Sequence, residues 1–392
     1  MDPRQNPYAP GAGYPPPELA GRDDLIERAA IGLDRIRAKR AARSVILYGL
    51  RGVGKTVLLN KIRMDAEARG FAAVSIEAPE GRSLPAIIAP ALRATLFGLS
   101  RGQAVRAGAQ KAMRALGNFI GALKVKYSDI ELSMDTGSDP GVADSGDLEL
   151  DLADLFQAVG DAAEERGTAV VLSIDELQYV PEEQLAALIS ALHQVSQRQL
   201  PVTMIAAGLP QLVGQTGRAK SYAERLFEFS RIDRLTDAAA RDALRKPATK
   251  EGVAFTDAAV AEILRQTQGY PYFLQEWAKH SWNMADASPI DESDASAATI
   301  AALAELDASF FRVRFDRLTP AEKRYMRAMA ELGAGPHRSG DIAEKLGKKV
   351  TTVAPLRNTL ISKGMIFSQS HGDTAFTVPL FDGFMKRIMP EL

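Results

Sequence analysis

The sequence contains no cysteine among its 392 residues. This absence excludes disulfide bonds, zinc sites built from thiolates and catalysis by a thiol. Histidine is also scarce, and no H-x-x-x-H or H-E-x-x-H pair is present, so we expect packing or surface roles for the four histidines rather than a metal site. They are His193, His280, His337 and His371.

Long apolar runs and an excess of charge are missing as well. No run approaches the roughly 18 to 20 apolar residues needed to cross a bilayer, and residues 1–8 lack the apolar core of a secretory signal. We therefore expect a cytoplasmic protein without a membrane partner. The net charge of −1 gives no overall attraction to nucleic acid, so any such binding must come from a local patch.

What is present begins with Gly49 to Thr56, GLRGVGKT, which fits the G-x-x-x-x-G-K-[ST] spacing of a phosphate-binding loop, or Walker A motif. Residues 44–48 are β-prone and residues 57–64 have a helical pattern, which is the context the motif requires. The glycines let backbone N–H groups approach a phosphate, and the helix dipole favours the same place. Lys55 is predicted to neutralise the β- and γ-phosphates, and the Thr56 hydroxyl to take one Mg²⁺ position.

A second motif, of Walker B type, is an apolar strand over 169–174 that ends in Asp175 and Glu176. Ligands of an α/β sheet collect beyond the carboxyl ends of its strands. Asp175 is predicted to bind Mg²⁺, and Glu176 to orient and deprotonate the water that attacks the γ-phosphate. Gln178, two residues further on, is a candidate sensor of that phosphate.

The order of patterns predicts four parts. Residues 1–17, with six prolines, are predicted to be a disordered tail, the alternative being a strap that docks on the body. Residues 18–234 are predicted to form an α/β P-loop NTPase core, a parallel sheet with helices on both faces, with an insertion at about 79–166. Within the insertion we expect helical structure over 84–120, a hairpin over 123–134 that is either a DNA contact or an internal brace, and a polar loop over 136–147. Residues 235–317 are predicted to be an all-α lid and linker.

Residues 318–392 are predicted to form a C-terminal winged helix-turn-helix of three helices and two strands. Residues 337–371 include six basic and two acidic residues, so the local charge is about +4 (six minus two). One alternative is contact with double-stranded DNA, with Arg357 and Asn358 as the best base readers. The other is docking on a protein or on the chain's own body. The basic residues are Arg338, Lys345, Lys348, Lys349, Arg357 and Lys363; the acidic ones are Asp341 and Glu344.

With these motifs in this order, the chain resembles the AAA+ and STAND-like P-loop ATPases, and is most similar to bacterial and archaeal proteins related to origin-recognition ATPases. The resemblance covers residues 18–385 and implies ATP and Mg²⁺ as cofactors and a homo-oligomer on ATP binding. It also implies that the segment containing Arg22 lies beside the adenine and that Pro271, in a G-x-P motif, lies against the base. Arg225 would reach the γ-phosphate of its own or a neighbouring subunit, unless it pairs with Glu224 or Glu228.

One departure from that family is the end of the fourth strand, Ala206-Ala207-Gly208, which lacks the usual polar sensor. Either Gln178 or Thr203 does this work, or turnover is slow. The predicted catalytic residues are Glu176, Lys55 and Arg225, and the metal ligands Thr56 and Asp175. The predicted nucleotide-binding residues are Gly49, Leu50, Arg51, Gly52, Val53, Gly54, Lys55, Thr56, Val57, Arg22, Gln178 and Pro271.

The combined prediction is an ATP-binding, slowly hydrolysing switch whose nucleotide state repositions the winged helix in association with DNA. The alternative is a signalling or scaffold ATPase that oligomerises with ATP and uses the winged helix for protein contacts.

Overall fold

The structure is a computed structural model that describes residues 1–11, 13–100, 106–134, 140–368 and 372–392. The chain divides into two compact units. The first unit comprises Met1–Asp23, Gly49–Val57 and Ile232–Leu392, and the second Asp24–Tyr48 and Leu58–Arg231. In the described residues, no helix combines the length and apolarity that crossing a membrane requires.

A five-stranded parallel sheet in the order β2-β3-β4-β1-β5 forms the centre of the second unit. The central strands β3 and β4 are buried along nearly their whole length, which accounts for their continuous apolar sequences. β1 pairs with both β4 and β5, so that Val45 lies opposite Ile205 on one side and Glu228 on the other. The strands are β1 (Ser44–Tyr48), β2 (Ala72–Glu77), β3 (Val170–Asp175), β4 (Val202–Gly208) and β5 (Phe227–Arg231).

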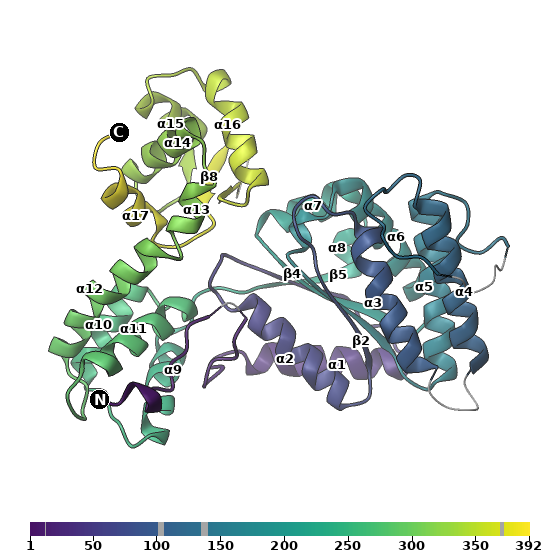
Figure 1. Ribbon diagram of the computed structural model, residues 1–392, viewed down its shortest axis with the longest axis horizontal. Helices are drawn as coiled ribbons and strands as arrows, with labels where there is room; N and C mark the ends of the chain where they lie inside the picture. The colour runs from purple at the N-terminus through teal and green to yellow at the C-terminus, as the bar shows by residue number, and fades with distance from the viewer. Residues whose placement is uncertain (12, 101–105, 135–139, 369–371) are drawn as a thin grey trace. The chain divides into compact units, whose positions relative to one another are not determined.

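Helices cover both faces of this sheet, as Figure 1 shows: α1 and α2 lie on one face and α3 to α6 on the other. This distribution follows from right-handed crossovers, because the connection from β1 to β2 runs across the sheet in the opposite direction to the later ones. The predicted P-loop NTPase fold is confirmed. The helices are α1 (Asp23–Arg37), α2 (Lys55–Ala68), α3 (Leu84–Leu99), α4 (Arg106–Leu123), α5 (Leu148–Glu165), α6 (Glu182–Gln197), α7 (Gln211–Ala219) and α8 (Ala223–Leu226), with a 3₁₀ turn η2 (Leu177–Tyr179).

The insertion differs from its prediction. The helical structure predicted over 84–120 consists of two helices, α3 and α4; residues 101–105 between them lie outside the described part of the chain. The hairpin predicted over 123–134 is wrong, because α4 continues to Leu123 and turns follow it, with the N–H of Tyr127 donating to Leu123 O at 2.9 Å. Ile130 is buried in the core, so its apolar character reflects packing and not strand pairing. The predicted polar loop over 136–147 lies partly outside the described residues, at 136–139.

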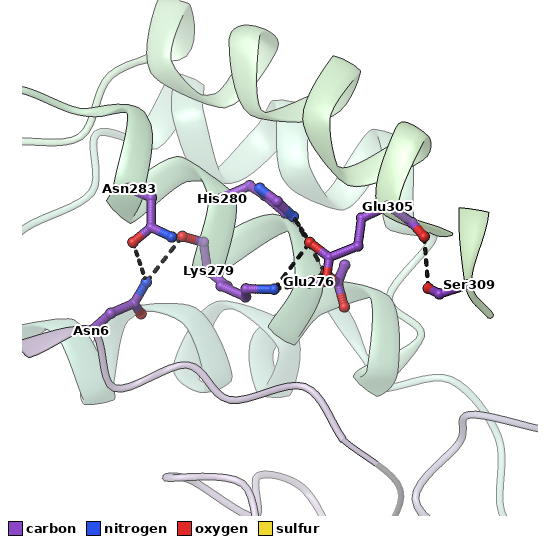
Figure 2. A network of polar contacts seen from close by, with 7 residues as sticks. All are labelled: Asn6, Glu276, Lys279, His280, Asn283, Glu305 and Ser309. Atoms are coloured by element: carbon purple, nitrogen blue, oxygen red, sulfur yellow. Dashed lines mark hydrogen bonds and ion pairs between the residues drawn. The ribbon is translucent and has the colours of Figure 1, made fainter. Parts of the chain in front are cut away.

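In the first unit, the start of the chain is packed against helices. The indole of Trp282 donates to Asp2 O at 3.1 Å. Figure 2 shows the amide of Asn6, which donates to Lys279 O at 3.0 Å and to Asn283 Oδ1 at 2.9 Å. Tyr8 is 3% exposed, and its hydroxyl donates to a backbone carbonyl of α9. These contacts correct the predicted disordered tail to the other alternative, a docked strap. The helices of this part are α9 (Asp237–Lys250), α10 (Asp257–Thr267), α11 (Pro271–Met284), α12 (Glu292–Ala308) and α13 (Arg312–Asp316), with the 3₁₀ turn η1 (Pro3–Gln5) in the strap.

The C-terminal part contains the three predicted helices and an antiparallel sheet in the order β6-β8-β7. The short strand β6 and the last helix, α17, were not predicted. α17 contributes its own buried residues Phe381 and Phe384 to the core of this part. The elements are α14 (Pro320–Glu331), β6 (His337–Arg338), α15 (Ser339–Lys345), α16 (Val350–Ser362), β7 (Ile366–Phe367), β8 (Asp373–Phe376) and α17 (Phe381–Ile388).

Candidate functional site

The phosphate-binding loop follows β1 directly and ends where α2 begins, as its sequence requires. A β-carbon on Gly49 would lie 2.0 Å from Ile232 O, so only glycine fits this first position of the loop. Lys55 is 8% exposed, and its ammonium donates to Gly49 O at 3.0 Å and to Leu50 O at 2.7 Å. The loop therefore holds its lysine against its own carbonyls, and a phosphate would have to draw the ammonium away from them.

Arg22 braces this loop from the preceding segment. Its guanidinium donates to Asp233 O at 2.6 Å and to Val53 O at 3.3 Å. Burial lowers the pKa of Arg22, an effect opposed by the charge of Asp233. The sequence predicted that Arg22 lies near the nucleotide, and within the first unit its side chain does contact the loop. The docked strap reaches the loop as well, since a β-carbon on Gly13 would lie 3.5 Å from Thr56 Cγ2.

Two backbone hydrogen bonds tie the loop to other elements of the first unit. The N–H of Tyr272 donates to Gly52 O at 3.1 Å, and the N–H of Arg51 donates to Thr377 O at 2.8 Å, just after β8. Pro271 is the first residue of α11, so the helix start predicted to face the base is also the one that bonds the loop.

The ring of Tyr272 continues this connection into α13. It stacks on Phe310 with centroids 4.7 Å apart, and the guanidinium of Arg314 lies 4.0 Å from the Phe310 centroid on the ring face. Burial raises the pKa of Tyr272 to about 12. Next to Phe310, Phe311 packs against Phe384 of α17 with centroids 5.3 Å apart. An aromatic chain thus runs from the loop to the C-terminal helices.

The acidic pair lies in the second unit, at the carboxyl edge of the sheet. Asp175 ends β3 opposite Glu77 of β2, and on the same edge Tyr48 of β1 lies opposite Gly208 of β4. Glu176 has a φ of 52°, in the left-handed region, and its N–H donates to Asp175 Oδ1 at 2.8 Å. Two successive carboxylates therefore stand at the carboxyl edge of the sheet, the edge at which β1 also ends.

Of the two candidate sensors, Thr203 lies at the wrong end of its strand. It is the second residue of β4, 5% exposed, and its hydroxyl lies 3.2 Å from Ser44 Oγ at the start of β1. Because β1 and β4 are parallel, both residues belong to the amino edge of the sheet. Gln178 is at the carboxyl edge, also 5% exposed, and its amide contacts Glu176 and the backbone of Leu209.

Arg225 is an exposed residue of α8, in the second unit. Glu228, one of the two acids considered as its partner, pairs instead with Arg28, Nη1 to Oε1, at 3.5 Å. The predicted reach of Arg225 to a γ-phosphate stays a prediction.

Two of the six cations in the basic patch predicted over 337–371, Arg357 and Lys363, donate hydrogen bonds to other residues of the chain. Arg357 donates to Thr374 Oγ1 at 3.0 Å and to Ser368 Oγ at 2.9 Å, and Lys363 donates to Glu322 Oε2 at 2.8 Å. Arg357 thus braces α16 against β8, and the base contact predicted for it stays a prediction. Four exposed cations of the patch lie on or around α15 and the start of α16: Arg338, Lys345, Lys348 and Lys349.

One group of three potential metal ligands occurs among the described residues, and the sequence reading did not find it because its members lie on two helices. Glu276 and His280 of α11 and Glu305 of α12 place their ligand atoms within 4.8 Å of one another. The ammonium of Lys279 also lies there, 3.0 Å from Glu305 Oε1 and 3.5 Å from Glu276 Oε1 (Figure 2). Because this lysine already supplies a cation, we assign the cluster a structural role between the helices.

Comparison with known proteins agrees with the loop and the sheet. Residues 18–205 match the family model described as AAA ATPase domain, and residues 308–385 match a domain of unknown function, DUF8462. No curated protein matches the chain.

Three solved structures are similar over nearly the whole chain. The Walker-type ATPase PABY2304 of Pyrococcus abyssi has 14% identity and a TM-score of 0.60, covering 94% of this chain and 96% of that chain. The ORC1 protein of Aeropyrum pernix in complex with DNA has 14% identity and a TM-score of 0.48, covering 95% and 94%. RuvB of Thermotoga maritima has 15% identity and a TM-score of 0.46, covering 91% and 93%. Only the first supports a shared fold. Residues 18–205 are thus similar to an AAA ATPase domain, and the chain shares the P-loop NTPase fold of the Pyrococcus protein.

Proposed function

We propose that the chain is an ATP-binding, slowly hydrolysing switch, in which the nucleotide state of the loop at 49–56 repositions residues 318–392, a winged helix-turn-helix. The observation that carries this proposal is the pair of backbone bonds from the loop, one to Tyr272 at the start of α11 and one to Thr377 after β8. A phosphate that draws Lys55 away from Gly49 and Leu50 rearranges the loop backbone. Such a rearrangement acts on both bonds at once.

Within this function, the residues take the roles that their chemistry fits. Lys55 binds the β- and γ-phosphates, assisted by backbone N–H groups of 49–57, while Arg22 holds the loop and Pro271 borders the base. The Thr56 hydroxyl and the Asp175 carboxylate are hard oxygen donors of the kind that Mg²⁺ prefers. Mg²⁺ supplies neutralisation of charge on the phosphates. Glu176 accepts a proton from the attacking water, and Arg225 stabilises charge on the γ-phosphate.

Two substitutions test the ATPase part of the proposal. Lys55→Ala is expected to weaken ATP binding by at least about 100-fold, since it removes a charge-assisted contact to two phosphates. Glu176→Gln is expected to keep ATP affinity and to lower hydrolysis by about 100-fold or more, the usual share of a general base. Lys61→Ala, on the exposed face of α2 where Lys61 pairs with Asp65, serves as the control. Equal ATP affinity of the wild type and Lys55→Ala would refute the function.

For the output of the switch, we propose double-stranded DNA, on the strength of the exposed cations around α15 and the start of α16. If they bind phosphates, Lys348→Ala/Lys349→Ala lowers affinity for any duplex and reduces the slope of log K against log salt by about 2. Lys250→Ala, an exposed lysine on α9, is the control. If the full chain binds no duplex at low salt, the alternative holds: a signalling or scaffold ATPase that assembles with ATP through protein contacts.

A further inference from the structure

The side chain of Gln178 joins two structures at the carboxyl edge of the sheet. Its Nε2 donates to Glu176 Oε2, and its Oε1 accepts the N–H of Leu209, directly after β4, at 2.9 Å. Its own backbone carbonyl accepts from Gln215 Nε2 of α7 at 3.3 Å. Because the side chain is 5% exposed and both ends of its amide are bonded, its orientation is fixed by the fold.

The last residue of β4, Gly208, leaves room for this amide because it has no side chain. A β-carbon on Gly208 would lie 2.7 Å from Gln178 Oε1 and 2.8 Å from Leu212 Cδ2. Any larger residue at position 208 would therefore push the Gln178 amide from its place. The glycine that ends β4, at the point where the resembled family carries a polar sensor, thus makes room for a glutamine that comes from the loop after β3.

From this geometry we infer that Gln178 is a positioning residue for Glu176: it fixes the catalytic carboxylate to the end of β4. The N–H donated to Oε2 occupies one carboxylate oxygen and sets the direction of the other. Glu176 is itself in the left-handed region and is partly exposed, and the bond from Gln178 restricts the rotamers that its side chain can take. The inference rests on the proposed ATPase function, and it assigns Gln178 a role other than direct contact with the γ-phosphate.

The test compares two substitutions that remove the hydrogen bond from Gln178 to Glu176 in different ways. Gln178→Ala deletes the amide, whereas Gly208→Ala leaves Gln178 intact and displaces it. Both are expected to lower kcat by about 10- to 100-fold, the range for a displaced catalytic group, while the Kd for ATP changes by no more than about twofold. In the Glu176→Gln background, Gln178→Ala is expected to cause no further loss, because the group it positions is gone.

A control and a double variant distinguish the positioning of Glu176 from a general loss of order at the carboxyl edge of the sheet. Gln215→Ala removes the neighbouring bond to the Gln178 backbone without touching the Glu176 contact, and kcat should stay within about twofold of wild type. Gln178→Ala/Gly208→Ala should be no slower than Gln178→Ala alone, since the added methyl then has no amide to displace and its remaining close contact, with Leu212 Cδ2 of α7, does not involve Glu176. Thermal melting of each variant confirms that it is folded.

Three results would overturn the inference while leaving the proposed function standing. The first is a wild-type kcat in Gln178→Ala. The second is a higher kcat in that variant, which would mean that the bond from Gln178 slows hydrolysis. The third is a loss confined to ATP affinity, which would make Gln178 a nucleotide contact. A wild-type protein without any ATP hydrolysis would refute the proposed function, and the positioning role with it.

Discussion

Arg22 shows how one side chain can serve both the loop and the fold. Its guanidinium joins Val53 O of the loop to Asp233 O at the start of the lid segment. We expect Arg22→Ala to lower the free energy of unfolding by about 1–3 kcal/mol, because it leaves two partly buried carbonyls without their donor. ATP affinity should fall by about 10-fold, because the loop loses its brace.

Thermal melting and titration with a fluorescent nucleotide measure the two effects of Arg22→Ala. Arg35→Ala is a matched control, since Arg35 also donates to a backbone carbonyl, Ala41 O at 3.0 Å, but on exposed α1. If both variants bind ATP as the wild type does, Arg22 has no role in shaping the loop.

At the residue scale, the sequence identified chemical groups better than it identified their partners. Lys55 and Asp175 could be placed because a short motif fixes the first at a helix start and the second at a strand end. The bonds of Arg357 to Thr374 and Ser368, by contrast, are made across the fold, and no motif marks them. Gln178 was singled out for its position two residues after Glu176, yet its contact with Leu209 depends on the order of strands in the sheet. Spacing along the chain carries no such information.

At the element scale, α11 and α12 are joined by the cluster that contains Glu276, whose pKa is raised above its ordinary value. Burial raises the pKa of Glu276, although Lys279 and His280 lower it. A raised pKa in the folded state means that the stability due to this group is complete below its unfolded value of 4.5 and is lost as the pH rises through the folded pKa. We expect Glu276→Gln to gain melting temperature relative to wild type as the pH rises from 4.5. A difference that shrinks with rising pH would contradict this.

Glu322 of α14 should behave in the opposite way. It is 2% exposed, and although burial raises its pKa, its bonds with Lys363 and Thr319 outweigh this and lower it below the ordinary value. Its contribution is therefore present above 4.5 and is lost as the pH falls through the folded pKa. We expect Glu322→Gln to cost about 1.5–3 kcal/mol at neutral pH, the value of a hydrogen bond to a charged group.

Melting curves at several pH values should show the cost of Glu322→Gln vanishing in acid. Glu331→Gln on the same helix is the control; its carboxylate pairs with Arg327 at 2.6 Å but is exposed, so a smaller loss is expected. A pH-independent cost for Glu322→Gln would show that packing, and not charge, is responsible.

Elements with strong apolar patterns were predicted well, whereas short elements and those fixed by distant contacts were not. The strands of the five-stranded sheet carry apolar runs, and most helices carry an apolar period. The wrong hairpin over 123–134 arose because the last turn of α4 and the buried Ile130 together mimic alternation. The strap is fixed by single contacts, such as the buried ring of Tyr8 against Phe255, which a proline-rich composition does not reveal.

At the scale of the whole molecule, the first unit brings together segments that are distant in sequence. Arg22, Gly52, Tyr272 and Thr377 are joined through the loop by backbone or guanidinium bonds. The aromatic chain from Tyr272 through Phe310 and Phe311 to Phe384 packs alongside the same route. A sequence predicts none of these long-range contacts, but they give the loop a physical connection to residues 318–392.

The switch proposal predicts that nucleotide changes the distance between the C-terminal part and the second unit. Because the chain has no native cysteine, spin labels attach only where cysteines are introduced. Val350→Cys on α16 and Val125→Cys after α4 are suitable, since the two valines are 47% and 94% exposed. We expect the distance distribution from pulsed electron resonance to differ between ADP and a non-hydrolysable ATP analogue by several ångströms, on the order of one helical turn, about 5 Å. The same pair in the Lys55→Ala background should show no response to either nucleotide. Identical distributions with ADP and the analogue in labelled protein that still binds both would mean that the loop does not move the C-terminal part.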